Sequence, residues 1–225
     1  MRFSLALLGA LVLFLSACER PEPGPAAKPV HQSRAKVQFD ETAFGDALDE
    51  IAAWHDSVGT GWSAPAGMER AAVEVLFEEL PFTVNDELAL LWQRWGDPHG
   101  DRPFVLDYRL LSADQARARY DALRSDTTVP WRPNWIPVLA AGDRWLLVES
   151  SRSGAPAGPV VAYRPGESPV VAFANLTRLS RTVAEALEAA RWTGGHMAVD
   201  EVTLRRAHAE HNPDLTLPDH VVGVQ

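Results

Sequence analysis

Apolar residues recur at helical spacing through the first half of the chain. In residues 40–58, Phe44, Leu48 and Ile51 stand at positions i, i+4 and i+7, which places them on one face of a helix. Asn85 is a good N-cap for the third of the helices predicted in this half, because its side chain can accept from a free backbone N–H. The same spacing predicts helices over residues 65–80, 85–96 and 112–123.

Beyond residue 134 the pattern changes to short apolar runs that Gly- and Pro-bearing turns separate, which is typical of β-strands. Pro137 falls inside the first run and cannot donate a backbone hydrogen bond, so we expect it at a sheet edge or a bulge. The strands are predicted at residues 104–108, 135–139, 144–149, 160–163 and 170–173.

A last strong helical pattern spans residues 181–192. Helices first, then a sheet, then a closing helix predict an α+β fold in one domain, residues 39–195. We expect a central, mainly antiparallel sheet of about four to six strands. Residues 196–225 read as a polar C-terminal extension with a short helix at 199–210.

The N-terminal residues carry a targeting pattern. Residues 1–17 combine one basic residue, Arg2, with an apolar run and small residues, as in a secretory signal. The sequence Leu-Ser-Ala-Cys at 15–18 resembles the lipobox of bacterial lipoproteins, in which the cysteine, here Cys18, is acylated and the preceding peptide is removed. An ordinary cleaved signal and an N-terminal membrane helix are the alternatives.

By the same resemblance, Glu19 after the cysteine favours the outer membrane over the inner, with the protein facing the periplasm of the cell envelope. Residues 18–38 are rich in Pro, Ala and charge, and too poor in large apolar side chains to form a core. We therefore expect an extended tether between the lipid on Cys18 and the domain.

Charge and cysteine content exclude several function classes. The 225-residue chain has a formal net charge of −9, which disfavours nucleic acid and favours encounter with a basic partner. Cys18 is its single cysteine, so a disulfide scaffold, a cysteine-based zinc site and cysteine catalysis are not expected.

The order of motifs resembles the SUKH superfamily, the Smi/Knr-like proteins named for a fungal cell-wall assembly regulator. The motifs are Leu80-Pro81 at a helix end, Leu110-Leu111-Ser112 before a helix, Trp135-Ile136-Pro137-Val138 in a strand, and the turn Gly142-Asp143. Bacterial members look largely like immunity proteins against toxins. The resemblance implies an α+β domain that works by binding a protein, either a toxin domain or an envelope factor. The stretches that carry the resemblance are residues 65–97, 107–124, 131–150 and 158–187.

Two groups of residues raise the question of a metal site. Asp97, His99 and Asp101 could surround a cation, but Gly96 and Pro98 equally predict a helix end followed by a solvated turn. His208 and His211 stand at i, i+3 on a possible helix without an evident third ligand. We expect a solvated turn and a solvated helix, and we assign no metal, no cofactor and no catalytic residue.

The strongest candidates for partner binding are Trp131, Arg132 and Trp135, because Trp and Arg are enriched at interface hot spots. Glu149 and Ser151 join them, since the loop from residue 150 to 158 connects two predicted strands and is exposed by expectation. The alternative is that Trp135 begins a core strand and Trp131 covers its edge.

Together these patterns predict a non-enzymatic, lipid-anchored envelope protein that binds a protein partner. Two alternatives remain. One is a metal-assisted envelope hydrolase that uses Asp97, His99 and Asp101. The other is a structural envelope lipoprotein.

Overall fold

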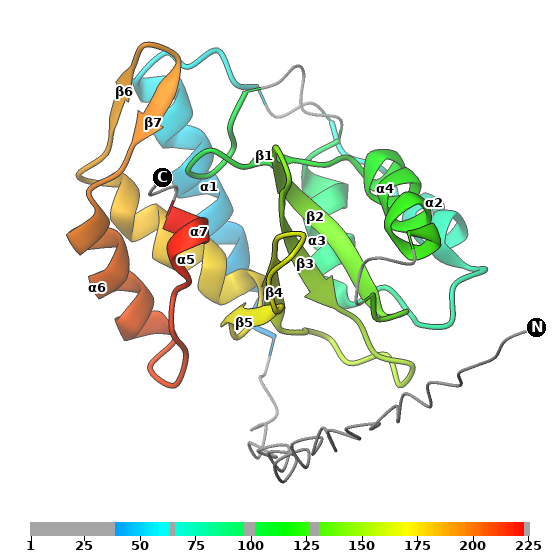
Figure 1. Ribbon diagram of the computed structural model, residues 1–225. Coiled ribbons are helices and arrows are strands. Elements are labelled where there is room, and N and C mark those ends of the chain that lie inside the picture. The colour runs from blue at the N-terminus through cyan, green and yellow to red at the C-terminus, as the bar shows by residue number, and fades with distance from the viewer. Residues whose placement is uncertain (1–38, 64–65, 97–101, 127–130, 223–225) are drawn as a thin grey trace, which may run out of the picture. The chain divides into compact units, whose positions relative to one another are not determined.

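The computed structural model describes residues 39–63, 66–96, 102–126 and 131–222 (Figure 1). These residues belong to one compact unit of the chain. The predicted signal sequence, Cys18 and the tether lie outside the described residues, as do Asp97, His99 and Asp101. Within the described ranges, no helix combines the length and the apolar character needed to cross a membrane.

Five antiparallel strands form a central sheet in the order β1-β2-β3-β4-β5, which confirms the predicted α+β fold class. A bulge interrupts the β2–β3 register between Pro137 and Leu139, where the missing N–H of proline is tolerated, as predicted. The strands are β1 (Arg109–Leu110), β2 (Trp135–Ala141), β3 (Arg144–Glu149), β4 (Val160–Tyr163) and β5 (Val170–Phe173).

The strand predicted at residues 104–108 is wrong. Tyr108 N donates to Val105 O at 2.8 Å, which closes a tight turn there. Leu106 in this turn has φ of 56°, a left-handed conformation that a continuous strand would not contain. The chain reaches the sheet only at β1, which is two residues long.

Three helices of the first half begin at residues whose side chains cap them, among them the predicted cap Asn85. The side chains of Asp40, Asn85 and Ser112 accept from the third residue that follows each of them, and Ser112 with Gln115 completes a capping box. The capped helices are α1 (Glu41–Ser57), α3 (Asp86–Arg94) and α4 (Ala113–Ser125), and α2 (Arg70–Phe77) has no side-chain cap.

Helix α2 begins later than the sequence pattern predicts. Met68 N donates to Trp92 O at 2.8 Å, so the segment before α2 packs along the C-terminal end of α3 instead of turning into a helix. A Cβ at Gly67 would lie 1.8 Å from Gln93 O, which shows how closely the two backbones approach.

The predicted closing helix is displaced toward the N-terminus. Helix α5 (Leu176–Leu187) starts where Asn175 accepts from Arg178 N, five residues before the start that the apolar spacing suggested. Residues beyond it form a small hairpin of β6 (Arg191–Thr193) and β7 (His196–Ala198), so Trp192 belongs to a strand.

The C-terminal residues form more than the expected polar extension. Helix α6 (Glu201–His211) packs on α5 and α7 (Asp219–Val222) follows it, with Leu204, Leu217 and Val221 buried in the core. In Figure 1, α1, α5 and α6 gather on one side of the sheet and α2 and α4 on the other. The fold therefore continues through residue 222.

Candidate functional site

All five residues that we predicted to bind a partner lie together at one end of the β2–β3 hairpin. The antiparallel register pairs Trp135 at the start of β2 with Glu149 at the end of β3. Trp131 and Arg132 precede β2 and Ser151 follows β3. We call these five residues the open end of the hairpin, because the connecting turn at Gly142 and Asp143 lies at its other end.

Arg132 is the exposed member of the open end. Its Cζ lies 5.3 Å from the centroid of the Trp135 ring, a cation–π distance. Its Nη1 lies 3.8 Å from Oε2 of Glu149, to which Trp135 Nε1 also donates at 3.4 Å. The Arg132 side chain is 63% exposed and that of Glu149 is 14% exposed. The ring and the carboxylate thus orient a guanidinium whose remaining donors face solvent.

The two tryptophans of the open end pack against the core. Trp135 is buried, and Trp131 is partly buried against the core. Trp131 packs edge-on against Tyr120 of α4, with ring centroids 5.5 Å apart, and against Trp135 at 6.0 Å. The hydroxyl of Tyr120 donates to Pro133 O at 2.7 Å and fixes the segment between the two tryptophans. Both indole rings are therefore packing elements.

Ser151 shapes the loop that follows β3. Its Oγ accepts from Ala155 N at 2.9 Å and lies 3.2 Å from Ser153 Oγ. Neither partner could remove a proton from the hydroxyl, so this contact pattern is that of a loop-forming serine. Its carbonyl accepts from Thr83 N at 3.3 Å, which ties the loop to the segment before α3. Arg152, like Ser153, is exposed on the same loop.

Behind this loop lies a buried carboxyl group that the sequence analysis missed, that of Glu87 on α3. Its Oε1 accepts from Thr177 Oγ1 at 2.6 Å and Thr177 N at 3.0 Å, and its Oε2 from Leu176 N at 3.2 Å. Gly158 N donates to the same carboxyl group. Burial raises the pKa of Glu87 to about 7, against the lowering effect of these donors. The local sequence does not distinguish Glu87 from Asp86, whose side chain is partly exposed and pairs with Arg70 at 2.7 Å.

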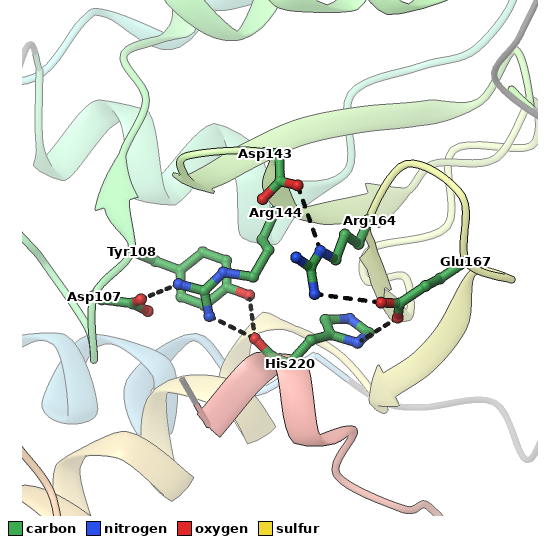
Figure 2. Close-up of polar contacts among 7 residues, drawn as sticks. All are labelled: Asp107, Tyr108, Asp143, Arg144, Arg164, Glu167 and His220. Carbon is green, nitrogen blue, oxygen red and sulfur yellow. Dashed lines mark hydrogen bonds and ion pairs between the residues drawn. The ribbon is translucent and has the colours of Figure 1, made fainter. Parts of the chain in front are cut away.

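The turn end of the hairpin carries a second arginine cluster, which Figure 2 shows. Arg144 lies with its Cζ 5.4 Å from the Tyr108 ring centroid and forms an ion pair with Asp107. Its Nη1 donates to the carbonyl of His220 on α7 at 2.6 Å. Burial raises the pKa of Tyr108, although the charge of Arg144 opposes this. The His220 ring reaches Glu167 in the β4–β5 turn, Nδ1 to Oε2, at 3.1 Å.

An acidic groove of about 370 Å³ opens between α1, α5 and α6. His211 and Arg181 are the basic side chains in its lining, and His211 Nε2 lies 3.1 Å from Glu185 Oε2. Such a groove attracts cationic groups. Its carboxylates belong to Asp46, Glu50, Glu185, Glu188 and Glu210.

The expected solvated helix at His208 and His211 is wrong for both histidines. His208 is buried, and its Nε2 contacts Ala172 O at 2.7 Å on the outer edge of β5. Burial lowers the pKa of His208, and the nearby charge of Arg205 adds to this. Across the described ranges, no group of three or more His, Cys, Asp or Glu side chains could hold a metal ion.

Comparisons with known proteins add no family. No protein-family model matches the chain, and no curated protein sequence matches it at a significant level.

Proposed function

We propose that this protein is a lipid-anchored component of the bacterial cell envelope that binds a protein partner through the open end of the β2–β3 hairpin. One observation carries the proposal: of the five interface candidates, Trp131, Arg132, Trp135 and Glu149 contact one another, and Arg132 is exposed and packs on Trp135 beside Glu149. An arginine held in this way loses little side-chain entropy on docking, which favours its use in recognition.

The resemblance to SUKH proteins supports the same class of function, since their bacterial members look largely like immunity proteins. We place the partner as a toxin domain or an envelope-assembly factor. The net charge of −9 and the acidic groove favour the approach of a basic partner, and Arg132 then supplies donors to its carbonyl or carboxylate groups. The work of the protein is binding rather than catalysis.

Anchoring follows from the lipobox resemblance. Acylation of Cys18 with more than one chain would hold the protein at the membrane, because each buried CH₂ contributes about 0.8 kcal/mol. Cys18→Ser abolishes acylation, so we expect unprocessed precursor and loss of the mature protein from the outer-membrane fraction. Unchanged processing and retention would remove the anchor from the proposal.

Site-specific photocrosslinking in intact envelopes tests the partner interface. We expect a photoreactive residue in place of Arg132 to give one discrete adduct, whose partner mass spectrometry identifies. The matched control is the same residue in place of Val202 on α6, which is 76% exposed and outside the open end. Wild-type protein should compete for the identified partner, and the Arg132→Glu variant should not. No adduct at 132, or the same adducts at both positions, would contradict the proposed interface.

A further inference from the structure

Helix α4 carries an arginine that resembles Arg132 but has no carboxylate beside it. The Cζ atom of Arg119 lies 4.4 Å from the centroid of the Trp145 ring, closer than Arg132 lies to its own ring. Trp145 is 5% exposed, whereas Arg119 is exposed. A buried indole ring of β3 therefore orients a guanidinium group at the surface.

The local sequence leaves Arg119 without an acidic partner. Within the described part of the chain, neither a carboxylate nor a carbonyl accepts a hydrogen bond from its guanidinium. Arg117 on the same helix differs, because it pairs with Asp121 at 3.1 Å. The residues three and four positions away from Arg119 on the helix are not acidic: they are Gln115, Ala116, Ala122 and Leu123.

Arg124 extends this arrangement toward the open end. It is exposed and follows Tyr120 by one helical turn. Burial raises the pKa of Tyr120, and the charge of Arg124 is the largest opposing cause, which places this charge near the ring. Tyr120 in turn packs on Trp131 of the open end. Asp121 lies within a helical turn of Arg124, but it is engaged by Arg117.

The strand register places Arg119 and Arg132 on one face of the sheet. Trp145 and Glu149 are four residues apart on β3, so their side chains leave the same face, about 13 Å from each other along the strand. Glu149 pairs across the sheet with Trp135, against which Arg132 packs. Figure 1 shows α4 on this side of the sheet, with α1, α5 and α6 on the other.

We infer that Arg119, Arg124 and Arg132 form one surface, the arginine face, that binds an acidic segment of the protein partner. This inference rests on the proposed function, which supplies the partner, and it goes further in assigning the chemistry of the segment that docks. A guanidinium pairs with a carboxylate through two parallel hydrogen bonds, which is a stronger contact than one with a neutral acceptor. Two carboxylates about 13 Å apart would therefore meet Arg119 and Arg132.

The other charges of the chain are consistent with this surface. Arg70, Arg164 and Arg205 are partly exposed as well, but each pairs with a carboxylate of the chain itself. Arg119 and Arg124 offer their charge to another molecule instead. The net charge of −9 acts on the partner as a whole during its approach, whereas these guanidinium groups act on the segment that docks.

The lysine content of the chain allows a direct test. The two lysines of the sequence are Lys28 and Lys36, so with both changed to arginine, Arg119→Lys places a single lysine in the arginine face. A carbodiimide joins an amine to a carboxylate in contact with it, and water is lost. In intact envelopes treated with a carbodiimide, we expect one protein adduct whose amide bond mass spectrometry locates at position 119 and at an Asp or Glu of the partner.

Arg191→Lys in the same background is the matched control. Arg191 is exposed on β6, outside the arginine face, so this variant should give no such adduct. No protein adduct at position 119, or the same adducts at both positions, would overturn the inference. An adduct with an envelope glycan in place of a protein would overturn it too.

This result is separable from that of the proposed interface. A photocrosslinked partner at position 132 without a carbodiimide adduct at 119 would overturn the acidic segment and leave the interface standing. An adduct at 119 without one at 132 would support the arginine face and move the interface from the open end to α4.

Affinity for the partner that crosslinking identifies gives a second measurement. Arg119→Ala should weaken binding about tenfold, the loss of one charge-assisted hydrogen bond. Arg117→Ala is the control on the same helix and should leave the affinity unchanged, because the chain's own Asp121 engages that arginine. Equal losses for the two variants would show that α4 contributes only general charge, which would overturn a specific contact at Arg119.

Discussion

The two ends of the β2–β3 hairpin carry the same combination of an arginine over an aromatic ring beside a carboxylate. The Cζ atom of Arg144 lies 5.4 Å from the centroid of the Tyr108 ring, and that of Arg132 lies 5.3 Å from the centroid of the Trp135 ring. The two arginines differ in what their remaining donors reach. Arg144 is 16% exposed and donates to the carbonyl of His220, whereas Arg132 is 63% exposed.

Residue types alone therefore do not identify a binding surface. At the turn end, Arg144 donates to the carbonyl of His220 in the chain's own C-terminal segment, so this cluster stabilises the fold. At the open end the same cluster presents its donors to solvent, so it can be used by another molecule. The contact of Arg144 with His220 O also shows which group suits such an arginine, namely a main-chain carbonyl.

The largest effect on stability is expected from removing the aromatic ring that packs against the arginine at each end, Trp135 or Tyr108. Trp135→Ala should lower the free energy of unfolding by about 3–5 kcal/mol, because it leaves a cavity under β2. Tyr108→Ala should cost a comparable amount, since Tyr108 is also fully buried. Urea unfolding followed by circular dichroism measures both. A Trp135→Ala variant of wild-type stability would mean that this ring belongs to the surface after all.

Substituting the arginine should lower stability more at the turn end than at the open end. Arg144→Ala leaves Asp107 and the carbonyl of His220 without their charged donor, so the free energy of unfolding should fall by about 2 kcal/mol. Arg164→Ala is the control in the neighbouring turn, because its pairs with Asp143 and Glu167 are exposed and contribute little. Equal losses for the two variants would show that the contact with α7 adds no stability.

Mild acid should loosen the packing of α6 on the edge of the sheet, where His208 contacts Ala172 O of β5. The pKa of His208 is lowered in the fold, so its contribution to stability is complete above its unfolded value of 6.5 and is lost as pH falls toward the folded pKa. The loss reaches at most about 1.4 kcal/mol per pH unit. His55, whose pKa burial also lowers, acts in the same direction.

Urea unfolding at pH 7 and pH 5 measures this loss. The stability difference between the wild-type protein and His208→Gln should shrink at pH 5, whereas His196→Gln, at an exposed position on β7, should show no such change. The contribution of Glu87 has the opposite sign, because it is complete below pH 4.5 and lost as pH rises to about 7. An unchanged difference for His208→Gln would place this histidine outside the acid response.

The parts of the fold that sequence reasoning predicted are those that local signals determine. Asn85 and Ser112 cap their helices as their side chains suggest, and Pro137 marks a bulge. The start of α5 was missed because the Asn175 cap precedes the apolar spacing that served as the signal. The sequence predicts a polar extension over residues 196–225 because α6 buries few large apolar side chains.

In the candidate site, too, local features could be predicted from the sequence and contacts between distant segments could not. The open end could be predicted because an antiparallel hairpin necessarily brings the start of β2 to the end of β3. The partial burial of Trp131 agrees with the alternative that Trp131 covers the edge of β2, but its partner Tyr120 belongs to another element and could not be named from the local sequence. The environment of Glu87 is harder still to predict, because Leu176 and Thr177, which donate to its carboxyl group, lie 89 and 90 residues later in the chain.

The smallest effect on stability should come from Arg132, and this makes it the sharpest test of the comparison. Arg132→Ala removes one cation–π contact and a 3.8 Å ion pair whose arginine is 63% exposed, so the free energy of unfolding should change by about 1 kcal/mol or less. The same change should abolish co-purification of the partner that crosslinking identifies. Arg132→Lys keeps the charge but loses the planar stacking on Trp135, so it should restore binding only in part. A variant at Arg132 that destabilises the fold as much as Arg144→Ala would make the two ends equivalent, and the open end would then be structural too.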